Sequence, residues 1–311
     1  MMIKDVVNSL PTVSVIVPAY NAEKDIANLI ESLLDSDYPK ELLEIIIVDN
    51  NSNDKTKDIV KQYPVKLLEE KNIQSSYAAR NLGIRKSNGE IIAFIDSDCI
   101  AAPQWIKEGV KTLISENVDL VGGKVEFVYS KHKTAAELYD SITHMQNEFG
   151  IKEFKASTTA NLFVKSFLFN EIGMFPDRVK SGGDGIWTSR ATKNGFLLVY
   201  SPEAIVYHPA RPIKSLLMKN YRIGTGMLNL MANNGSSSVR IICSIPASFL
   251  PPRLSTIKKR IHQRGTTEMN EKTIKMWCVS CLCKLSFGMG VLRSIFSIMA
   301  EKLKIKSSLE N

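Results

Sequence analysis

Short runs of β-branched and aliphatic residues alternate with helix-like stretches over the first hundred positions of the chain. Between the first two runs, apolar residues recur with helical spacing at Ile26, Leu29, Ile30, Leu33 and Leu34. The runs predict four buried strands, over residues 13–17, 45–48, 65–68 and 91–95. Because strands and helices alternate at short spacing, the pattern predicts βαβ units and a largely parallel sheet.

Further helices are predicted over residues 54–62, 75–86 and 105–115. We expect Asn21 to cap the helix that follows the first strand, because an Asn side chain can accept a hydrogen bond from a free backbone N–H group. The polar residues after the second strand, Asn51 and Ser52 among them, are expected to cap the next helix.

Beyond residue 115 the pattern becomes less regular. A strand is predicted over 120–129, helical structure over 131–155, and two short strands over 196–200 and 204–207, on either side of Ser201-Pro202. We expect one folded domain over residues 1–232 and a basic, partly amphipathic helical region over residues 233–311. Residues 233–238 are the predicted loop or linker between them.

Charge is distributed unevenly along the 311 residues, whose overall composition is that of a globular protein. From Arg211 onward there are 17 Lys and Arg against 4 Asp and Glu, whereas residues 1–210 have a net charge of −5. Such asymmetry predicts an anionic partner surface. The basic residues alternate with Leu, Ile and Phe and form no nucleic-acid-binding motif, so we expect a membrane surface and no nucleic acid.

Residues 277–300 are mostly apolar, but Lys284 and Arg293 interrupt them. A spanning helix needs about 20 nearly uncharged residues, so we expect this stretch not to cross a membrane. An amphipathic helix is predicted instead, with Leu292, Phe296 and Leu303 on one face and basic residues after it. A second such element is predicted over 241–252; the alternative is that both are ordinary helices that pack on the folded domain or on a second subunit.

The five cysteines form no framework of regular spacing, which favours a reducing compartment. The first residues show no charged-then-apolar signal segment. We therefore expect a cytoplasmic protein, peripheral at the inner face of the membrane.

Two carboxylates, Asp96 and Asp98, directly follow the strand predicted over 91–95. In an extended chain they point to the same side, where they repel each other unless a cation or proton lies between them. Ligands in open α/β sheets bind beyond the carboxyl ends of strands, and hard oxygen ligands suit Mg²⁺ or Mn²⁺ completed by phosphate oxygens. We therefore expect a metal-bound diphosphate; the alternative is a pair of acids in a solvated turn.

Asp49 follows the second strand and is expected to contact a base or ribose, as an acid after a strand does in dinucleotide folds. Arg80 lies on the predicted helix 75–86. We expect its guanidinium either to point toward a phosphate in the cleft or to lie in solvent.

Four segments, residues 15–23, 44–52, 79–84 and 89–98, make the chain similar to the family 2 glycosyltransferases of the A-type fold. That resemblance implies an α/β protein, with a mixed, mostly parallel sheet flanked by helices and, here, a helical basic C-terminal extension. It also implies an inverting enzyme that uses a nucleotide-sugar donor.

In this family the segment that ends at Asp96 and Asp98 binds the metal and the nucleotide diphosphate. The resemblance implies that Asp98 ligates the divalent cation, that Asp96 assists, and that His208 is a further ligand. A neutral imidazole is a good ligand for Mn²⁺ and an unusual one for Mg²⁺. The implied donor-binding residues are Pro18, Tyr20, Glu23, Asp49, Arg80, Asp96 and Arg222.

Asp184 lies in Ser181-Gly182-Gly183-Asp184, where the family usually has Gly-Glu-Asp with the Asp as catalytic base. Gly183 therefore replaces the usual Glu, which leaves its contribution to acceptor binding in question. Trp187, one turn later, is expected to pack against an acceptor sugar; the alternative is core packing.

The function implied is transfer of a sugar, from a UDP-sugar by preference, to a hydroxyl of a glycan or lipid-linked acceptor. Asp184 would be the base, and Mn²⁺ or Mg²⁺ would bind the diphosphate. The alternative is a non-catalytic sugar-nucleotide-binding or scaffolding protein of the same fold. The presence of Asp96, Asp98 and Asp184 together favours the enzyme.

Overall fold

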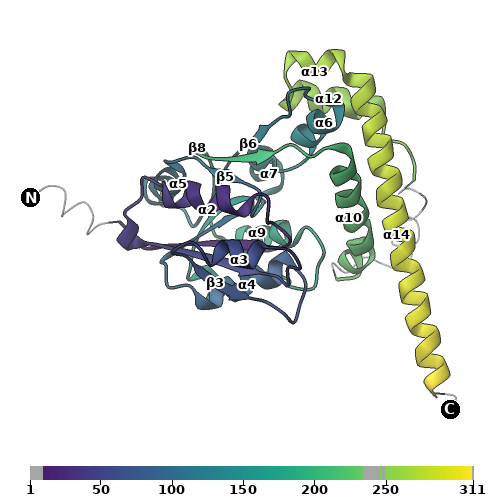
Figure 1. Cartoon of the computed structure of the whole chain (residues 1–311). Helices are drawn as coiled ribbons and strands as arrows, with labels where there is room; N and C mark the ends of the chain where they lie inside the picture. The colour runs from purple at the N-terminus through teal and green to yellow at the C-terminus, as the bar shows by residue number, and fades with distance from the viewer. Residues whose placement is uncertain (1–9, 234–245, 247–248, 310–311) are drawn as a thin grey trace, which may run out of the picture. The chain divides into compact units, whose positions relative to one another are not determined.

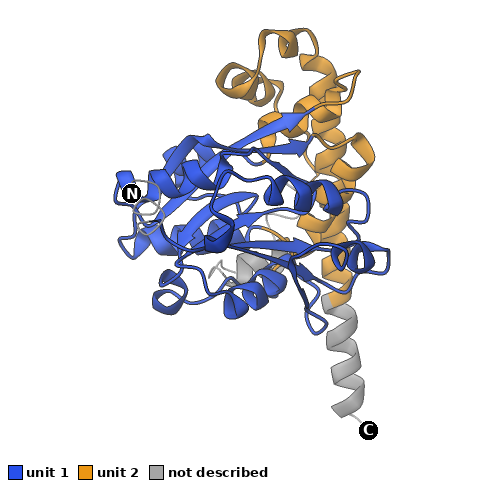
Figure 2. Ribbon diagram, turned by 60° about the vertical axis from the view of Figure 1, so that its left-hand side comes forward, with its two compact units in different colours: residues 1–128, 145–178, 182–209 blue, residues 129–144, 179–181, 210–311 orange. Residues whose placement is uncertain are grey.

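The computed structural model describes residues 10–233, 246 and 249–309, and the side chains of residues 10–227, 246 and 249–297. The chain divides into two compact units, which Figure 2 shows in different colours. The first unit consists of residues 1–128, 145–178 and 182–209, and the second of residues 129–144, 179–181 and 210–311. These units divide the chain at other points than the boundary expected near residue 232.

The first unit contains one eight-stranded sheet with the strand order β3-β2-β1-β4-β7-β6-β8-β5. Strands β1 to β4 pair in parallel, as predicted, whereas β7 and β5 run antiparallel to their neighbours. The strands are β1 (Val13–Ala19), β2 (Leu43–Asp49), β3 (Lys66–Glu69), β4 (Ile91–Ile95), β5 (Ile100–Ala101), β6 (Leu120–Val128), β7 (Asn161–Lys165) and β8 (Leu198–Pro209).

Helices cover both faces of this sheet (Figure 1). On one face, α2 (Ile26–Leu34) and α5 (Trp105–Ser115) bury apolar side chains against alternate residues of β1, β2 and β4. On the other face α4 (Ser76–Lys86) lies close to the sheet, because Gly83 has no side chain: a Cβ there would lie 2.5 Å from Cγ2 of Ile16. The remaining helices of this unit are η1 (Lys40–Leu42), α3 (Thr56–Val60), α7 (Asn147–Phe154), α8 (Leu168–Glu171) and α9 (Gly183–Lys193).

Two local predictions were wrong. The two short strands predicted on either side of Ser201-Pro202 are one strand, β8. Its pairing with β6 continues past this point through a register shift: Gly123 pairs with Ser201 and Lys124 with Ile205, so residues 202–204 lie outside the pairing. Asn21 does not cap α2; it has a φ of 50°, and its side chain accepts a hydrogen bond from the backbone N–H of Asn53 instead.

The second unit is helical. A small apolar core, which includes Leu138, Leu216 and Met276, holds its helices together. The helices are α6 (Ala135–Thr143), α10 (Ile213–Asn233), α12 (Leu254–Arg264), α13 (Thr267–Glu271) and α14 (Thr273–Leu309). Most of the predicted linker 233–238 and of the predicted amphipathic element 241–252 lies outside the described residues.

Within α14, Thr273–Ser297 is long and apolar enough to cross a membrane by length and composition alone, with a mean hydropathy of 1.4. The expectation that Lys284 and Arg293 exclude a span is therefore not upheld by this criterion. A soluble core helix also meets it, so the segment remains weak evidence for a membrane.

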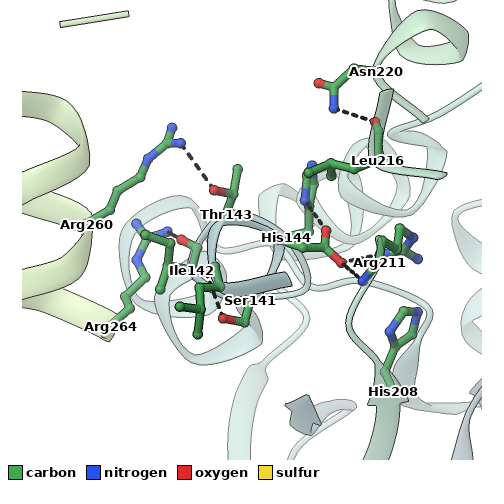
Figure 3. A network of polar contacts seen from close by, with 12 residues as sticks. Ser141, Ile142, Thr143, His144, His208, Arg211, Leu216, Asn220, Arg260 and Arg264 are labelled. Carbon is green, nitrogen blue, oxygen red and sulfur yellow. Dashed lines mark hydrogen bonds and ion pairs between the residues drawn. The ribbon is translucent and has the colours of Figure 1, made fainter. Parts of the chain in front are cut away.

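A fully buried carboxylate, Asp140, ties α6 to the segment that precedes α10. Oδ1 of Asp140 accepts a hydrogen bond from Nδ1 of His144 at 2.7 Å. Oδ2 of Asp140 accepts from the backbone N–H of Arg211 at 3.0 Å and from its Nη1 at 3.2 Å. Figure 3 shows His144 and Arg211 with these hydrogen bonds as dashed lines. Burial, together with the positive charge of Lys219, lowers the pKa of His144 to about 4, so at neutral pH the imidazole is uncharged and Arg211 balances the carboxylate.

Candidate functional site

The loops that follow β1 and β2 are joined by reciprocal hydrogen bonds. The Asn21 N–H donates to Oγ of Ser52 at 3.0 Å, and the Asn53 N–H donates to Oδ1 of Asn21 at 2.9 Å. Glu23 takes part, because its Oε2 accepts from the Lys55 N–H at 3.1 Å. The expected role of Ser52 as a helix cap is therefore wrong: its hydroxyl joins the two loops.

Asp49 ends β2 and is fully buried. One of its oxygens, Oδ2, accepts from the Ser52 N–H at 3.1 Å, while Oδ1 has no hydrogen-bond partner among the described residues. A buried carboxylate oxygen without a partner is costly unless a ligand supplies a donor. The position therefore suits a hydroxyl or N–H group of a bound nucleotide.

Asp98 and His208 meet at the edge of the same sheet. Strand β5 pairs with β8 so that Ile100 lies opposite Tyr207, which places the adjoining residues Cys99 and His208 side by side. Nε2 of the buried His208 lies 3.4 Å from Oδ2 of the half-exposed Asp98.

This donor set fits a divalent cation. Two ligand atoms that are each about 2.1 Å from one ion lie roughly 3 to 3.5 Å apart, as these two do. Cys99 adds a sulfur atom, since the ligand atoms of Asp98, Cys99 and His208 all lie within 4.8 Å of one another. Nearby, burial and the Asp98 carboxylate raise the pKa of Asp25, and a cation would relieve this repulsion between two acids.

Arg80 and Asp96 form an ion pair in which the arginine is buried and the carboxylate is partly exposed. Nη2 of Arg80, whose residue is 3% exposed, donates to Oδ1 of Asp96 at 2.5 Å. The alternative of a solvated Arg80 is thereby excluded. Because Arg80 already balances the charge of Asp96, Asp98 is the acid better placed to ligate a cation.

Asp184 lies in the first turn of α9, where the helix N-terminus favours a carboxylate. Its Oδ1 accepts from the Tyr77 hydroxyl at 3.1 Å and from the Gly185 N–H at 2.9 Å, and its Oδ2 accepts from the Thr159 N–H at 3.3 Å. Three elements therefore hold this carboxylate: α4, α9 and the segment before β7.

The prediction that Trp187 contacts an acceptor sugar is wrong, because Trp187 is fully buried. Its ring stacks on Phe169 with 4.6 Å between centroids, and its Nε1 donates to the Gly173 carbonyl at 2.6 Å. Arg190, one turn later, donates to the Met174 carbonyl at 2.8 Å. These two side chains fasten α9 to the preceding loop.

The remaining predicted donor-binding residues occupy different places. Pro18 is buried in β1, and Tyr20, which follows that strand, is 49% exposed. Arg222 is exposed on α10, in the second unit. The structure thus groups Glu23 with the β1 and β2 loops, Arg80 with Asp96, and Asp98 with His208, and it leaves the role of Arg222 a prediction.

Three residues of the site were missed from the sequence: Asp25, Cys99 and Tyr77. Cys99 directly follows Asp98, so its position in the sequence could have suggested a further metal ligand. Asp25 lies two residues after Glu23, and that closeness could likewise have suggested a place in the site. Tyr77 gave no signal of its own, because its partner Asp184 is 107 residues away in the chain.

The chain is similar in sequence to known proteins. The chain matches Glycosyl transferase family 2 over residues 14–170. It is 38% identical over 296 residues to the glycosyltransferase AglE of Haloferax volcanii, an alignment that covers 93% of this chain and 97% of AglE. It is 29% identical over 211 residues to the poly(ribitol-phosphate) β-N-acetylglucosaminyltransferase TarS of Staphylococcus aureus, covering 64% of this chain and 35% of TarS.

Two solved structures share the fold. The mannosyltransferase PcManGT of Pyrobaculum calidifontis, in complex with GDP-Man and Mn²⁺, superposes with a TM-score of 0.60 at 18% identity, covering 94% of this chain and 89% of that chain. TarS 1–349 of S. aureus, in complex with UDP-GlcNAc, has a TM-score of 0.54 at 20% identity and covers 91% of each chain. They confirm the predicted A-type glycosyltransferase fold.

The sequence matches and the shared fold both indicate a glycosyltransferase. The family match extends over half of the chain, and the similarity to AglE extends over nearly all of it. The chain belongs to glycosyl transferase family 2 and is a glycosyltransferase.

Proposed function

We propose that this glycosyltransferase moves a sugar from a nucleoside-diphosphate donor to an acceptor hydroxyl by a single inverting displacement, with Asp184 as the general base. The observation that carries the proposal is the placement of two separate groups of acids by α4. Arg80 of this helix pairs with Asp96, beside the proposed cation ligand Asp98, and Tyr77 of the same helix contacts Asp184. One group serves the leaving diphosphate and the other the attacking hydroxyl.

An acceptor hydroxyl has a pKa far above 7, so a carboxylate must take its proton as the new bond forms. The three hydrogen bonds to Asp184 hold this carboxylate in one orientation. Attack from the side of the base, opposite the departing diphosphate, inverts the anomeric carbon. Asp49, with its unpartnered Oδ1, is proposed to accept a hydrogen bond from the nucleoside.

A divalent cation fits the donor set of Asp98 and His208, with Cys99 beside it. When bound, the ion would supply positive charge to the diphosphate leaving group. We propose Mn²⁺ over Mg²⁺, because imidazole nitrogen is a better ligand for Mn²⁺. The Mn²⁺ complex of the mannosyltransferase neighbour supports this choice.

The donor is proposed to be a UDP-sugar, as in the TarS complex with UDP-GlcNAc, and the acceptor a glycan or lipid-linked sugar. The GDP-Man complex of the mannosyltransferase neighbour makes GDP-sugars the second class to test.

A donor screen with an active-site variant tests the proposal. Purified protein is incubated with UDP-, GDP- and dTDP-sugars and Mn²⁺, and release of nucleoside diphosphate is followed by mass spectrometry. Asp184→Asn is expected to lower the turnover number by about 10²- to 10⁴-fold, because it removes the base. Its affinity for UDP is expected to stay unchanged, since Asp184 belongs to the attacking side.

The matched control is Asp177→Asn, which removes an acid from the loop before α9 and should keep turnover near the wild-type value. Tight nucleotide binding without turnover of any donor by the wild-type protein would favour a non-catalytic sugar-nucleotide-binding protein instead.

We also propose that α14 attaches the protein to an anionic membrane surface. Its apolar side chains at positions 282, 285, 289, 292 and 296 are 37 to 67% exposed and recur every three or four residues, which places them along one face. The opposite face, with Met276, Cys283 and Val291, is buried within the second unit. A helix that is apolar and exposed along one face suits the membrane interface better than a span, which lipid surrounds.

A further inference from the structure

Tyr77, Gly183 and Asp184 form a mutually fitted group at the N-terminus of α9. We propose that Tyr77 is a positioning residue for Asp184, and that position 183 must be glycine because the Tyr77 ring occupies the space a side chain would need. This inference deepens the proposed function and rests on the assignment of Asp184 as the general base.

The steric evidence comes from Gly183. A Cβ added there would lie 2.9 Å from Cε2 and Cζ of Tyr77 and 3.0 Å from its Cδ2. Cβ atoms do not normally approach other atoms this closely, so either the ring or α9 would have to move. The ring has little freedom to do so, because Tyr77 is only 5% exposed and packs against Phe175 with 6.0 Å between centroids.

The polar evidence comes from the other end of the ring. The Tyr77 hydroxyl donates to Oδ1 of Asp184 at 3.1 Å, and it is the one side chain among the described residues that does so; the other two donors are backbone N–H groups. Burial and the Asp184 charge raise the pKa of Tyr77, so the hydroxyl keeps its proton and stays a donor. A carboxylate held by three donors has a fixed orientation, and one acceptor site on Oδ2 is left to take the proton of the acceptor hydroxyl.

Tyr77 also connects the two sides of the reaction. Arg80 lies one turn later on α4, with Cζ 5.6 Å from the centroid of the Tyr77 ring, and it forms the ion pair with Asp96. A single helix face thus fixes the base relative to the acid on the diphosphate side. This arrangement predicts that loss of the Tyr77 hydroxyl changes the chemical step and not donor binding.

Tyr77→Phe tests the hydroxyl alone. The turnover number is expected to fall by about 10- to 100-fold, the loss typical of one hydrogen bond to a charged group, while the KM for the donor stays unchanged. A purely structural role would not confine the loss to the turnover number, because a displaced α4 would also move Arg80 and its partner Asp96 and raise the KM for the donor.

The matched control is Tyr38→Phe. Tyr38 is also buried, and its hydroxyl donates to the Pro11 carbonyl at 2.5 Å, with no contact to a predicted site residue among its described hydrogen bonds. It should keep the wild-type turnover number and the wild-type KM for the donor. Equal effects of the two variants would overturn the positioning role and leave the proposed function intact.

Gly183→Ala tests the steric fit without any assay of activity. We expect it to lower the melting temperature in the wild-type background and to have little further effect in Tyr77→Ala, where the ring is absent. Gly185→Ala is the matched control, because a Cβ there has no atom within 4 Å, and it should behave alike in both backgrounds. Additive effects of Gly183→Ala and Tyr77→Ala on the melting temperature would overturn the fit.

The two sets of measurements separate the possible failures. Absence of turnover with every donor would overturn the proposed function and, with it, the role of Tyr77 in the reaction. The melting temperatures would still decide whether Tyr77 and Gly183 are mutually fitted.

Discussion

At the scale of single residues, the two acids after β4 have different surroundings. Asp96 is neutralised by the buried Arg80, whereas Asp98 faces the imidazole of His208 and lies close to Asp25. An acid that faces a histidine and lies close to a second acid gains more from a divalent ion than one that a buried arginine already neutralises.

Removal of His208 is expected to weaken Mn²⁺ binding by at least about tenfold, because His208→Ala deletes one direct ligand. Mg²⁺ binding should change less, since imidazole is a poor ligand for Mg²⁺. Titration calorimetry with each ion and no donor measures both affinities. His262→Ala, which removes an exposed histidine of α12, is the control, and equal Mn²⁺ affinity in the two variants would exclude His208 as a ligand.

The acids of the site are easier to predict from the sequence than the side chains around them. Asp49, Asp96 and Asp98 follow strand ends, and a strand end can be predicted from local hydrophobic pattern. Trp187 was assigned to the wrong environment, because its burial depends on aromatic side chains from other elements. Tyr77 was missed for the same reason: only the folded chain places it against Asp184.

At the scale of elements, the parallel β1–β4 half of the sheet was predictable, since each strand there is a short apolar run and each crossover is a helix. Strand β7 was not predicted, nor was α9. Pairing of β7 with β4 and β6 connects residues about 40 to 70 positions apart, and no local pattern reports such contacts.

The hydrogen bonds that Asp140 accepts from His144 and Arg211 make the second unit sensitive to acid. His144 has a folded pKa of about 4, below the value of about 6.5 in an unfolded chain, so the unfolded state binds the proton first as the pH falls. The free energy of unfolding is therefore highest above pH 6.5 and decreases as the pH falls to 4. Asp140, whose pKa is lowered by His144 and Arg211 against the effect of burial, adds a further loss below pH 4.

His144→Gln should reduce the pH dependence of stability, because glutamine can donate to Asp140 but does not titrate. Between pH 6.5 and 4 the free energy of unfolding of the wild type is expected to fall by up to about 1.4 kcal/mol per pH unit more than that of the variant. Urea unfolding at several pH values measures the difference. His132→Gln, at an exposed position before α6, should retain the wild-type slope; if both variants do, His144 is not the titrating group.

At the scale of the whole molecule, charge and exposed apolar surface coincide in the C-terminal part of the chain. Residues from Arg211 onward have a surplus of 13 positive charges, and α14 exposes an apolar face. Each feature alone is weak evidence for a membrane, since a basic patch also binds soluble anions and an apolar face also binds proteins. Their combination on one segment specifically suits anionic lipid.

Leu285→Glu combined with Met289→Glu tests this proposal, because it puts two negative charges in the middle of the exposed face of α14. Sedimentation with vesicles that contain anionic lipid is expected to fall by more than about tenfold, since apolar burial is lost and the new charges are repelled. Ile114→Glu with Leu197→Glu is the matched control: these side chains are 55% and 56% exposed in the first unit, and the change in charge is the same.

If both pairs reduce sedimentation equally, net charge alone governs binding and α14 is not the docking face. If the wild type sediments equally with neutral vesicles, the basic residues do not contribute, and if it sediments with neither, the membrane proposal is wrong.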